Sequence, residues 1–148
     1  MNKKNAVIFD MDGTLCDVRS IRHLVTGKGR NFHAFHMESA SCPPNMPVVE
    51  EARKARARGD AVLIVTARMY RYKAVTSMWL ALHSVPSDAL YMRADGDCRQ
   101  DYTVKREILN RIRSHYTPIH AFDDNPNVIA LWAEEGVPCT TVPGWGDV

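Results

Sequence analysis

Hydrophobic residues in this chain fall into short runs, which alternate with longer stretches that mix apolar and polar positions. The runs cover residues 6–9, 61–65, 89–92, 119–122 and 138–142. Each is short enough for a buried strand, and the run AVLIV at 61–65 is β-branched and apolar throughout. Strands that alternate with helices favour a parallel sheet. We therefore predict a doubly wound α/β fold with a Rossmann-like sheet of about five mostly parallel strands.

Between the runs, apolar residues recur with the period of a helix, and this predicts four helices. They cover roughly residues 45–58, 71–83 and 102–114, and a fourth begins at Pro126 and ends before Gly136. In the second helix, the residues expected to face the core are Val75, Met78, Trp79 and Leu82. Met69 and Trp132 are expected in the core as well.

Residues 16–44 interrupt this alternation between the first strand and the first core helix. A short helix is plausible at 31–39, but glycines and prolines break up the rest of the segment. We interpret 16–44 as a small cap insertion over one end of the sheet. The chain of 148 residues is then a single domain, residues 1–148.

Composition narrows the class of protein. The chain is 45% hydrophobic and 24% charged, and no stretch approaches the roughly 20 apolar residues of a membrane helix. The four cysteines are scattered, with no CxxC pair, which disfavours a zinc site or a disulfide framework and favours a cytoplasmic protein. A net charge of +2 does not by itself indicate nucleic-acid binding.

Polar residues gather where three of the predicted strands end. The segments are Asp10-Met11-Asp12-Gly13-Thr14, Thr66-Ala67-Arg68 and Asp123-Asp124, and Lys105 lies near the start of a helix between them. Because ligands of open α/β sheets bind beyond the carboxyl ends of the strands, we expect these groups to converge on one site.

Several carboxylates in one place repel one another and stay ionised only around a cation, and oxygen ligands suit Mg²⁺. A carboxylate such as Asp10 can attack phosphorus, and Asp12 can then serve as general acid and base. Thr66 and Lys105 are expected to bind the transferring phosphoryl oxygens. Gly13 allows a tight turn whose backbone N–H groups face the phosphate.

These motifs resemble those of the haloacid dehalogenase (HAD) superfamily. DMDGT is similar to its first motif, DxDx(T/V), VTAR to its second, Lys105 to its third, and the Asp123–Asp124 pair to its fourth. The second Asp of DxD implies a phosphatase. The resemblance also implies that Mg²⁺ is held by the Asp10 carboxylate, the Asp12 backbone carbonyl and a fourth-motif acid. Asp124 is the first choice for that acid, and Asp123 is the alternative.

A second resemblance is to the 3′-phosphatase domain of bacteriophage polynucleotide kinase. It rests on Met92-Arg93-x-x-x-Asp97-x-Arg99-x-Asp101-x-x-x-Lys105 and on the run AFDDNPNVIALWAEEGVPC. This likeness implies that Asp101 pairs with Lys105 and positions it, that Arg68, Arg93 and Arg99 line the substrate side, and that the substrate is a nucleic-acid 3′ end. It also implies another arginine soon after DMDGT, which is either Arg19 or Arg22.

Several alternatives stay open. The segment Thr26-Gly27-Lys28-Gly29 lacks the leading glycine of a phosphate-binding loop and follows no strand, so we expect no ATP site. Arg93 and Arg99 have a second interpretation as structural ion pairs, and the basic run at 53–58 as a solvated helix face. His33 and His36 suit a metal site, packing of the insertion or contact with substrate. Trp145 suits base stacking or anchoring of the chain end.

The function is open in the same way. Besides a polynucleotide 3′-phosphatase, the sequence suits a small-molecule phosphatase such as a nucleotidase, or a catalytically silent nucleic-acid-binding module. Sequence alone leaves DNA and RNA, the position of the phosphate and the oligomeric state undetermined.

Overall fold

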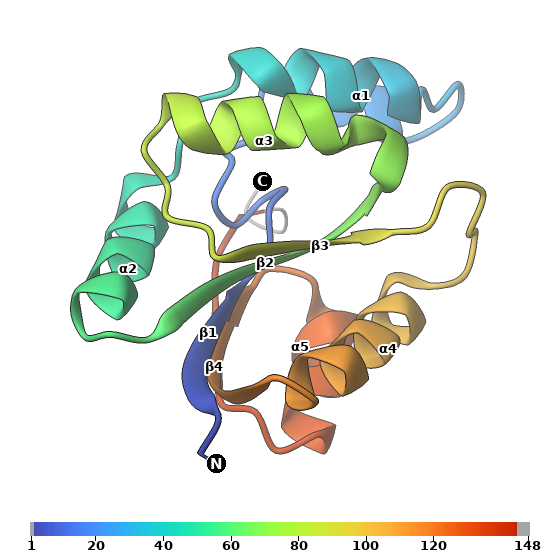
Figure 1. The fold of residues 1–148 in the computed structure, drawn as a ribbon. Coiled ribbons are helices and arrows are strands. Elements are labelled where there is room, and N and C mark those ends of the chain that lie inside the picture. The colour runs from blue at the N-terminus through green and yellow to red at the C-terminus, as the bar shows by residue number, and fades with distance from the viewer. Residues whose placement is uncertain (1, 145–148) are drawn as a thin grey trace.

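A computed structural model describes residues 2–144, which form one five-stranded sheet with helices on both faces (Figure 1). The strands are β1 (Lys4–Phe9), β2 (Ala61–Met69), β3 (Ala89–Arg93), β4 (Tyr116–Asp123) and β5 (Cys139–Thr141). Every pairing is parallel, and the spatial order is β3-β2-β1-β4-β5. The order reverses direction at β1, so the first strand lies at the centre, where α/β sheets bind ligands. The predicted fold class is confirmed.

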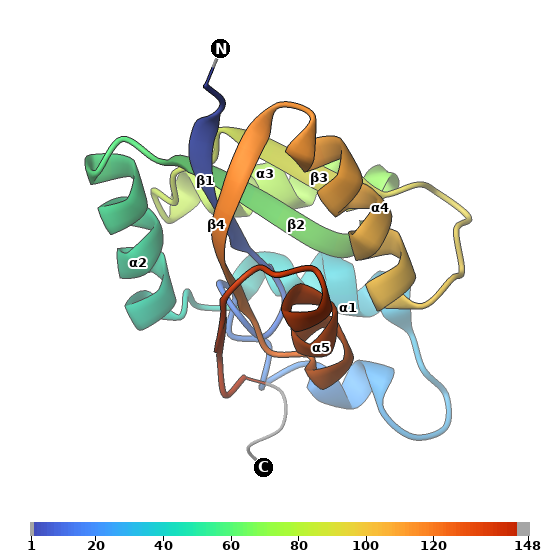
Figure 2. The same ribbon diagram turned by 90° about the horizontal axis from the view of Figure 1, so that it is seen from below.

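The helices α2 (Met46–Ala57) and α3 (Lys73–Leu82) cover one face, and α4 (Asp101–Arg113) and α5 (Pro126–Glu134) cover the other (Figures 1 and 2). Alternation along β1 explains the two layers, because Val7 and Phe9 join the α2–α3 cluster while Ala6 and Ile8 join the α4–α5 cluster. Trp132 of α5 is fully buried, as expected.

Two details of the predicted pattern were wrong. β2 extends to Met69, so Thr66 and Arg68 lie within the strand, and Met69 is half-buried. In α3, Met78 and Leu82 are 71% and 72% exposed. Trp79 is buried as expected, but the rest of the buried stripe is Thr76 and Leu80 rather than Val75, Met78 and Leu82; a short 3-10 turn at Tyr70–Tyr72 directly precedes the helix.

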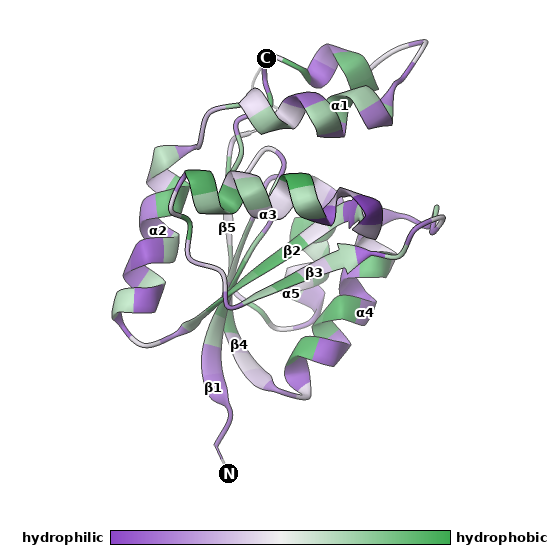
Figure 3. Ribbon diagram, turned by 45° about the horizontal axis from the view of Figure 1, so that its top comes forward, coloured by the Kyte–Doolittle hydropathy of each residue, from purple (hydrophilic) through white to green (hydrophobic). Residues whose placement is uncertain are grey.

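The insertion at 16–44 lies beyond the carboxyl ends of the strands, opposite the N-terminus (Figure 3). It contains a 3-10 turn at Arg22–Val25, the helix α1 (Phe32–Glu38) and a second 3-10 turn at Ser39–Ser41. Its two ends are tied together, because the Asp17 amide donates to the Pro43 carbonyl at 2.9 Å. The Trp79 indole of α3 donates to the Cys42 carbonyl at 2.9 Å, which fixes the insertion to the core.

A groove of about 1010 Å³ runs along the part of the sheet that α2 leaves open, beside β4 and β5. Its lining includes Val7 of β1, Phe122 of β4, Val142 just after β5, and Gly13. None of the helices within residues 2–144 is long and apolar enough to cross a membrane. Trp145 lies outside the described residues.

Candidate active site

The loop after β1 turns tightly and brings two carboxylates together. Gly13 has a φ of +81°, a conformation that side chains rarely adopt, and a Cβ there would lie 2.1 Å from the Asp124 carboxylate oxygen Oδ2. The hydroxyl of Thr14 returns to donate to Asp10 Oδ2 at 3.0 Å. A glycine at position 13 is therefore what allows the Asp124 carboxylate to approach this loop.

Lys105 of α4 is buried between two of the expected acidic residues. Its Nζ donates to Asp10 Oδ1 and to Asp123 Oδ2, both at 2.9 Å, and all three side chains are at most 10% exposed. Burial disfavours the charged ammonium, but the two carboxylates outweigh it and raise the pKa of Lys105. Lys105 is thus a fixed cation at the carboxyl edge of the sheet.

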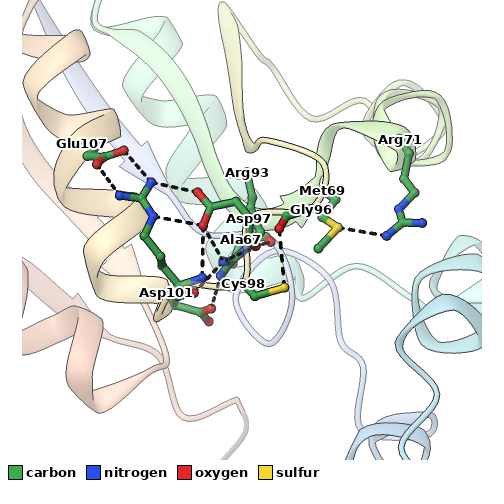
Figure 4. A network of polar contacts seen from close by, with 10 residues as sticks. Ala67, Met69, Arg71, Arg93, Gly96, Asp97, Cys98, Asp101 and Glu107 are labelled. Carbon is green, nitrogen blue, oxygen red and sulfur yellow. Dashed lines mark hydrogen bonds and ion pairs between the residues drawn. The ribbon is translucent and has the colours of Figure 1, made fainter.

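The expected pairing of Asp101 with Lys105 was wrong. Asp101 accepts from Arg93 Nη2 at 2.6 Å instead, and its side chain is 46% exposed (Figure 4). One helical turn separates it from Lys105, but the buried ammonium lies next to the desolvated carboxylates, where its Coulomb attraction is strongest.

Arg93 and Arg99 are engaged by the protein itself. Arg93 is buried and donates to the carbonyls of Ala67, Asp97 and Arg99 as well as to Asp101. The exposed Arg99 forms ion pairs with Asp97 and Glu107 (Figure 4). In this arrangement both arginines act as structural ion pairs that shape the 94–100 loop, rather than lining an open substrate side.

Arg68 was also expected on the substrate side, but it is 1% exposed and faces Asp12. Its Nη2 and Nε donate to the two Asp12 carboxylate oxygens at 2.6 and 3.0 Å. Its Nη1 donates to Thr76 Oγ1 and its Nη2 also donates to Ser39 Oγ, both at 2.9 Å. Burial would raise the pKa of Asp12, but the charge and hydrogen bonds of Arg68 hold it below its ordinary value.

The carboxylates of Asp10, Asp123 and Asp124 offer oxygens that all lie within 4.8 Å of one another. Burial and the neighbouring carboxylates raise the pKa of Asp10 well above its ordinary value, and burial raises the pKa of Asp124 to about 6. Both oxygens of Asp123 are already used, by Lys105 and by the Asn125 amide. Three acids beside one lysine leave excess negative charge, which a divalent cation with oxygen ligands would balance.

Thr66 is buried at the same edge, where its Oγ1 accepts from the Arg68 amide at 3.2 Å. Three contributors were missed from the sequence: Thr14, Ser39 and Thr76. Thr14 is part of the DMDGT motif and could have been included from it. Ser39 and Thr76 carry no sequence signal, since only folding brings them to Arg68.

The two histidines of the insertion pack against η3 (Tyr70–Tyr72). His33 Nδ1 lies 3.0 Å from the Tyr72 hydroxyl, and the His36 ring lies 4.6 Å from the Tyr72 ring. Burial lowers the pKa of His36 to about 4, so its imidazole is neutral. Within residues 2–144 the three-aspartate group is the one cluster found that could hold a metal, so the histidines have no metal-site partner there.

Comparison with known proteins agrees with this geometry. The family model described as "Polynucleotide kinase PNKP phosphatase domain" matches residues 4–145. A putative bifunctional polynucleotide kinase/RNA ligase of Autographa californica nuclear polyhedrosis virus is 28% identical over 136 residues, which are 90% of this chain and 18% of the viral protein.

Among solved structures, a chain of the Pnkp1/Rnl/Hen1 complex superposes with a TM-score of 0.82 and 30% identity, covering 99% of this chain and 48% of that chain. A class C acid phosphatase from Bacillus anthracis with tungstate bound shares the fold at a TM-score of 0.73, with 10% identity, covering 98% of this chain and 68% of that one. The chain therefore spans less than half the length of the first two relatives.

Proposed function

This chain belongs to the HAD-type family of polynucleotide kinase phosphatase domains, and from that premise we propose that it removes the phosphate from the 3′ end of a polynucleotide. It is a phosphatase. The proposal concerns its substrate, its metal and the task of each residue. The family membership supports a polynucleotide substrate, and so do relatives whose names refer to polynucleotide kinase and RNA repair.

The observation that carries the chemistry is the buried group formed by Asp10, Lys105 and the Asp123–Asp124 pair. A carboxylate at a strand end, held by a buried lysine, is positioned to attack phosphorus. The lysine can also bind a phosphoryl oxygen, on which negative charge is concentrated in the transition state.

In the first step, an Asp10 carboxylate oxygen forms a bond to phosphorus and the bond from phosphorus to the ester oxygen breaks. The leaving oxygen takes a proton from Asp12, which has to enter this step protonated although Arg68 favours its ionised form in the free protein; the free 3′-hydroxyl is produced. Thr66 and Lys105 hold the equatorial oxygens of the phosphoryl group during this transfer. The product on the enzyme is an aspartyl-phosphate at Asp10.

In the second step, Asp12 takes a proton from water, the water oxygen bonds to phosphorus, and the bond to Asp10 breaks. Inorganic phosphate leaves and both aspartates return to their starting state. Arg68 favours the ionised form of Asp12, which is the form that acts as base. Arg68 is therefore a positioning residue, with Ser39 and Thr76 holding it in turn.

Mg²⁺ fits the donor set of this site. We assign its ligands to the carboxylates of Asp10 and Asp124 and to the Asp12 backbone carbonyl, as the family motifs imply; Asp124 is preferred to Asp123 because Asp124 is half-buried whereas Asp123 is 1% exposed beneath Lys105. When bound, Mg²⁺ supplies positive charge that stabilises the transferring phosphoryl group.

The test is release of inorganic phosphate from a single-stranded oligonucleotide with a 3′-phosphate, with Mg²⁺ present. The comparison substrates are the same strand with a 5′-phosphate and a nucleoside 3′-monophosphate. Asp10→Asn keeps the size of the side chain but removes the nucleophile, so its rate should fall by orders of magnitude. Turnover of the mononucleotide but not of the oligonucleotide would retain the mechanism and reject the polynucleotide substrate.

A further inference from the structure

The insertion carries an excess of positive charge. Residues 16–44 contain four arginines and lysines, three histidines and two acidic residues, Asp17 and Glu38, and Asp17 pairs with Arg19. Lys28 and Arg30 lie on its exposed loop. Neither forms an ion pair with any residue of the described range 2–144.

The neighbouring corner of the molecule, residues 70–73 from the end of β2 to the start of α3, adds further positive charge beside the insertion. The exposed side chains of Arg71 and Lys73 form no ion pair within residues 2–144, although the Arg71 backbone amide donates to the Asp95 carboxylate at 2.8 Å and its guanidinium donates to Met69 Sδ. The Lys73 ammonium lies 5.2 Å above the ring of Tyr70, and the Arg71 guanidinium lies 5.5 Å from the ring of Tyr72. The contact of His33 with the Tyr72 hydroxyl at 3.0 Å joins this corner to the insertion.

The basic run of α2 shows the opposite behaviour. Arg53, Lys54, Arg56 and Arg58 pair with Glu50, Glu51, Asp88 and Asp60, respectively. Its charges are neutralised at short range, so it is a solvated helix face, as expected. Lys28, Arg30, Arg71 and Lys73 differ from this run because their side chains form no ion pair within residues 2–144, whereas Arg19 of the insertion pairs with Asp17.

Exposed aromatic rings lie among these unpaired cations. Phe32 at the start of α1 is 54% exposed and Tyr70 is 57% exposed. We call the set the cap surface; it comprises Lys28, Arg30, Phe32, Tyr70, Arg71 and Lys73. Cationic side chains interleaved with exposed rings are the combination that binds single strands, because phosphates contact the charges and unpaired bases stack on the rings.

The cap surface leads directly to the active site. Helix α1 begins at Phe32, and Ser39, the residue after its end, accepts a hydrogen bond from Arg68, which holds Asp12. At 1.5 Å per residue, α1 spans about 10 Å from the exposed ring to the site. A strand whose 3′ end lies at Asp10 can therefore run outward along the insertion.

We propose that the cap surface binds the unpaired strand that precedes the phosphorylated 3′ end. This inference rests on the proposed function and adds where the polymer is held. Phosphate contacts come from the unpaired cations, and base stacking comes from Phe32 and Tyr70. Preference for a polynucleotide over a mononucleotide then resides in the cap surface, outside the phosphoryl-transfer group.

The test compares kcat/KM for a 3′-phosphorylated single strand, longer than the roughly 4–16 nucleotides that one such surface contacts, with kcat/KM for a nucleoside 3′-monophosphate. Because both values scale with the concentration of folded protein, their ratio does not depend on how much of each variant is folded. We expect Lys28→Ala/Arg30→Ala to lower the ratio about tenfold. The slope of log(kcat/KM) against log[salt] should fall in magnitude by about 1.4, or roughly 0.7 for each lost phosphate contact.

Phe32→Ala should lower the same ratio about fivefold or more, which corresponds to the lower end of the free energy of one base–aromatic stacking contact. The salt slope should stay unchanged because no charge is removed. Lys54→Ala is the matched control, since Lys54 is 66% exposed and paired with Glu51. It should keep the wild-type ratio and slope.

The outcomes separate the two proposals. If wild-type protein does not prefer the oligonucleotide to the mononucleotide, the proposed polynucleotide substrate is rejected, and the role of the cap surface with it. If the preference exists but survives in both cap variants, the proposed function stands and this inference is overturned. An unchanged ratio when the strand is fully paired to its complement would overturn the requirement for unpaired bases.

Discussion

Lys105 and Arg68 are both buried cations at the carboxyl edge of the sheet, and each binds a carboxylate, but their proposed roles differ. Lys105 lies between Asp10 and Asp123, beside the proposed point of attack. Arg68 binds Asp12 through two hydrogen bonds and is 1% exposed, so its guanidinium is not accessible to substrate. We propose that Lys105 contacts the phosphoryl group directly and that Arg68 acts through Asp12.

Arg68→Lys tests the second assignment. Lysine retains the charge but cannot reproduce the bidentate contact with Asp12 together with the bonds to Ser39 and Thr76. We expect kcat to fall by about 100-fold, the cost of a misplacement on the order of 1 Å, with little change in KM. Steady-state kinetics on a 3′-phosphorylated strand would measure this. Thr76→Val, which removes one supporting bond, should cause a much smaller loss, and a raised KM with unchanged kcat would place Arg68 on the substrate instead.

Asp124 provides a test of the metal through pH. Its pKa rises from 3.8 to about 6 in the folded protein without a bound ion, so folding takes up a proton between these values. Stability of the metal-free protein should therefore fall as pH rises through that window. Mg²⁺ binds the ionised carboxylates and opposes this loss, so the increase in Tm on adding Mg²⁺ should be larger at pH 7 than at pH 5. Thermal unfolding of Asp124→Asn should show a much weaker pH dependence of that increase, and an equal Mg²⁺ effect at both pH values would contradict the assignment.

At the scale of elements, loops at the carboxyl edge are held by side chains rather than by regular pairing. Arg93 ends β3 and binds the carbonyls of Asp97 and Arg99, so the 94–100 loop is folded around one guanidinium (Figure 4). It also reaches Ala67 in β2 and Asp101 at the start of α4. This single side chain thereby fixes the position of the start of α4, the helix that carries Lys105.

Arg93→Met should loosen that loop. The substitution removes the donors for three carbonyls in a mostly buried position, so we expect a loss of about 2–4 kcal/mol in the free energy of unfolding. Denaturant unfolding measures the loss, and hydrogen exchange should show faster exchange in residues 94–102. Arg99→Met is the control: its ion pairs are half-exposed, so its cost should stay under about 1 kcal/mol. Equal losses in the two variants would show that Arg93 does not organise the loop.

For the whole molecule, the central sheet separates two apolar clusters, one on each of its faces. Ile64 faces the α2–α3 cluster and Ile8 faces the α4–α5 cluster. Both are at most 1% exposed, so each layer stabilises the sheet from its own side.

Ile8→Val and Ile64→Val should each lower stability by about 0.5–1.5 kcal/mol. Because the two side chains pack in separate clusters, the double variant should lose the sum to within roughly 0.5 kcal/mol. A double-mutant cycle by urea unfolding measures the difference. Coupling well above that value would mean that the two layers do not behave as independent clusters.

Much of this protein follows from local sequence. Buried runs alternating with amphipathic stretches were enough to predict the parallel sheet and its covering helices, since periodicity records which face of each element is buried. Polar residues directly after the first and fourth runs predicted where Asp10 and Asp123 lie, because parallel strands end at one edge. The insertion could be located for the same reason, as the segment that breaks the alternation.

The tertiary structure alone decided which charges pair. Lys105 lies four residues from Asp101 but binds Asp10, 95 residues away, because folding places its ammonium beside desolvated carboxylates. Arg68 likewise turns inward to Asp12 and Ser39 rather than toward substrate. The same limit applies to the basic stretches. Sequence shows charges on both α2 and the insertion, and only the folded chain shows that those of α2 are paired while Lys28 and Arg30 of the insertion are exposed without an ion pair in residues 2–144. Pairing depends on distance and desolvation between remote segments, which the order of residues does not state.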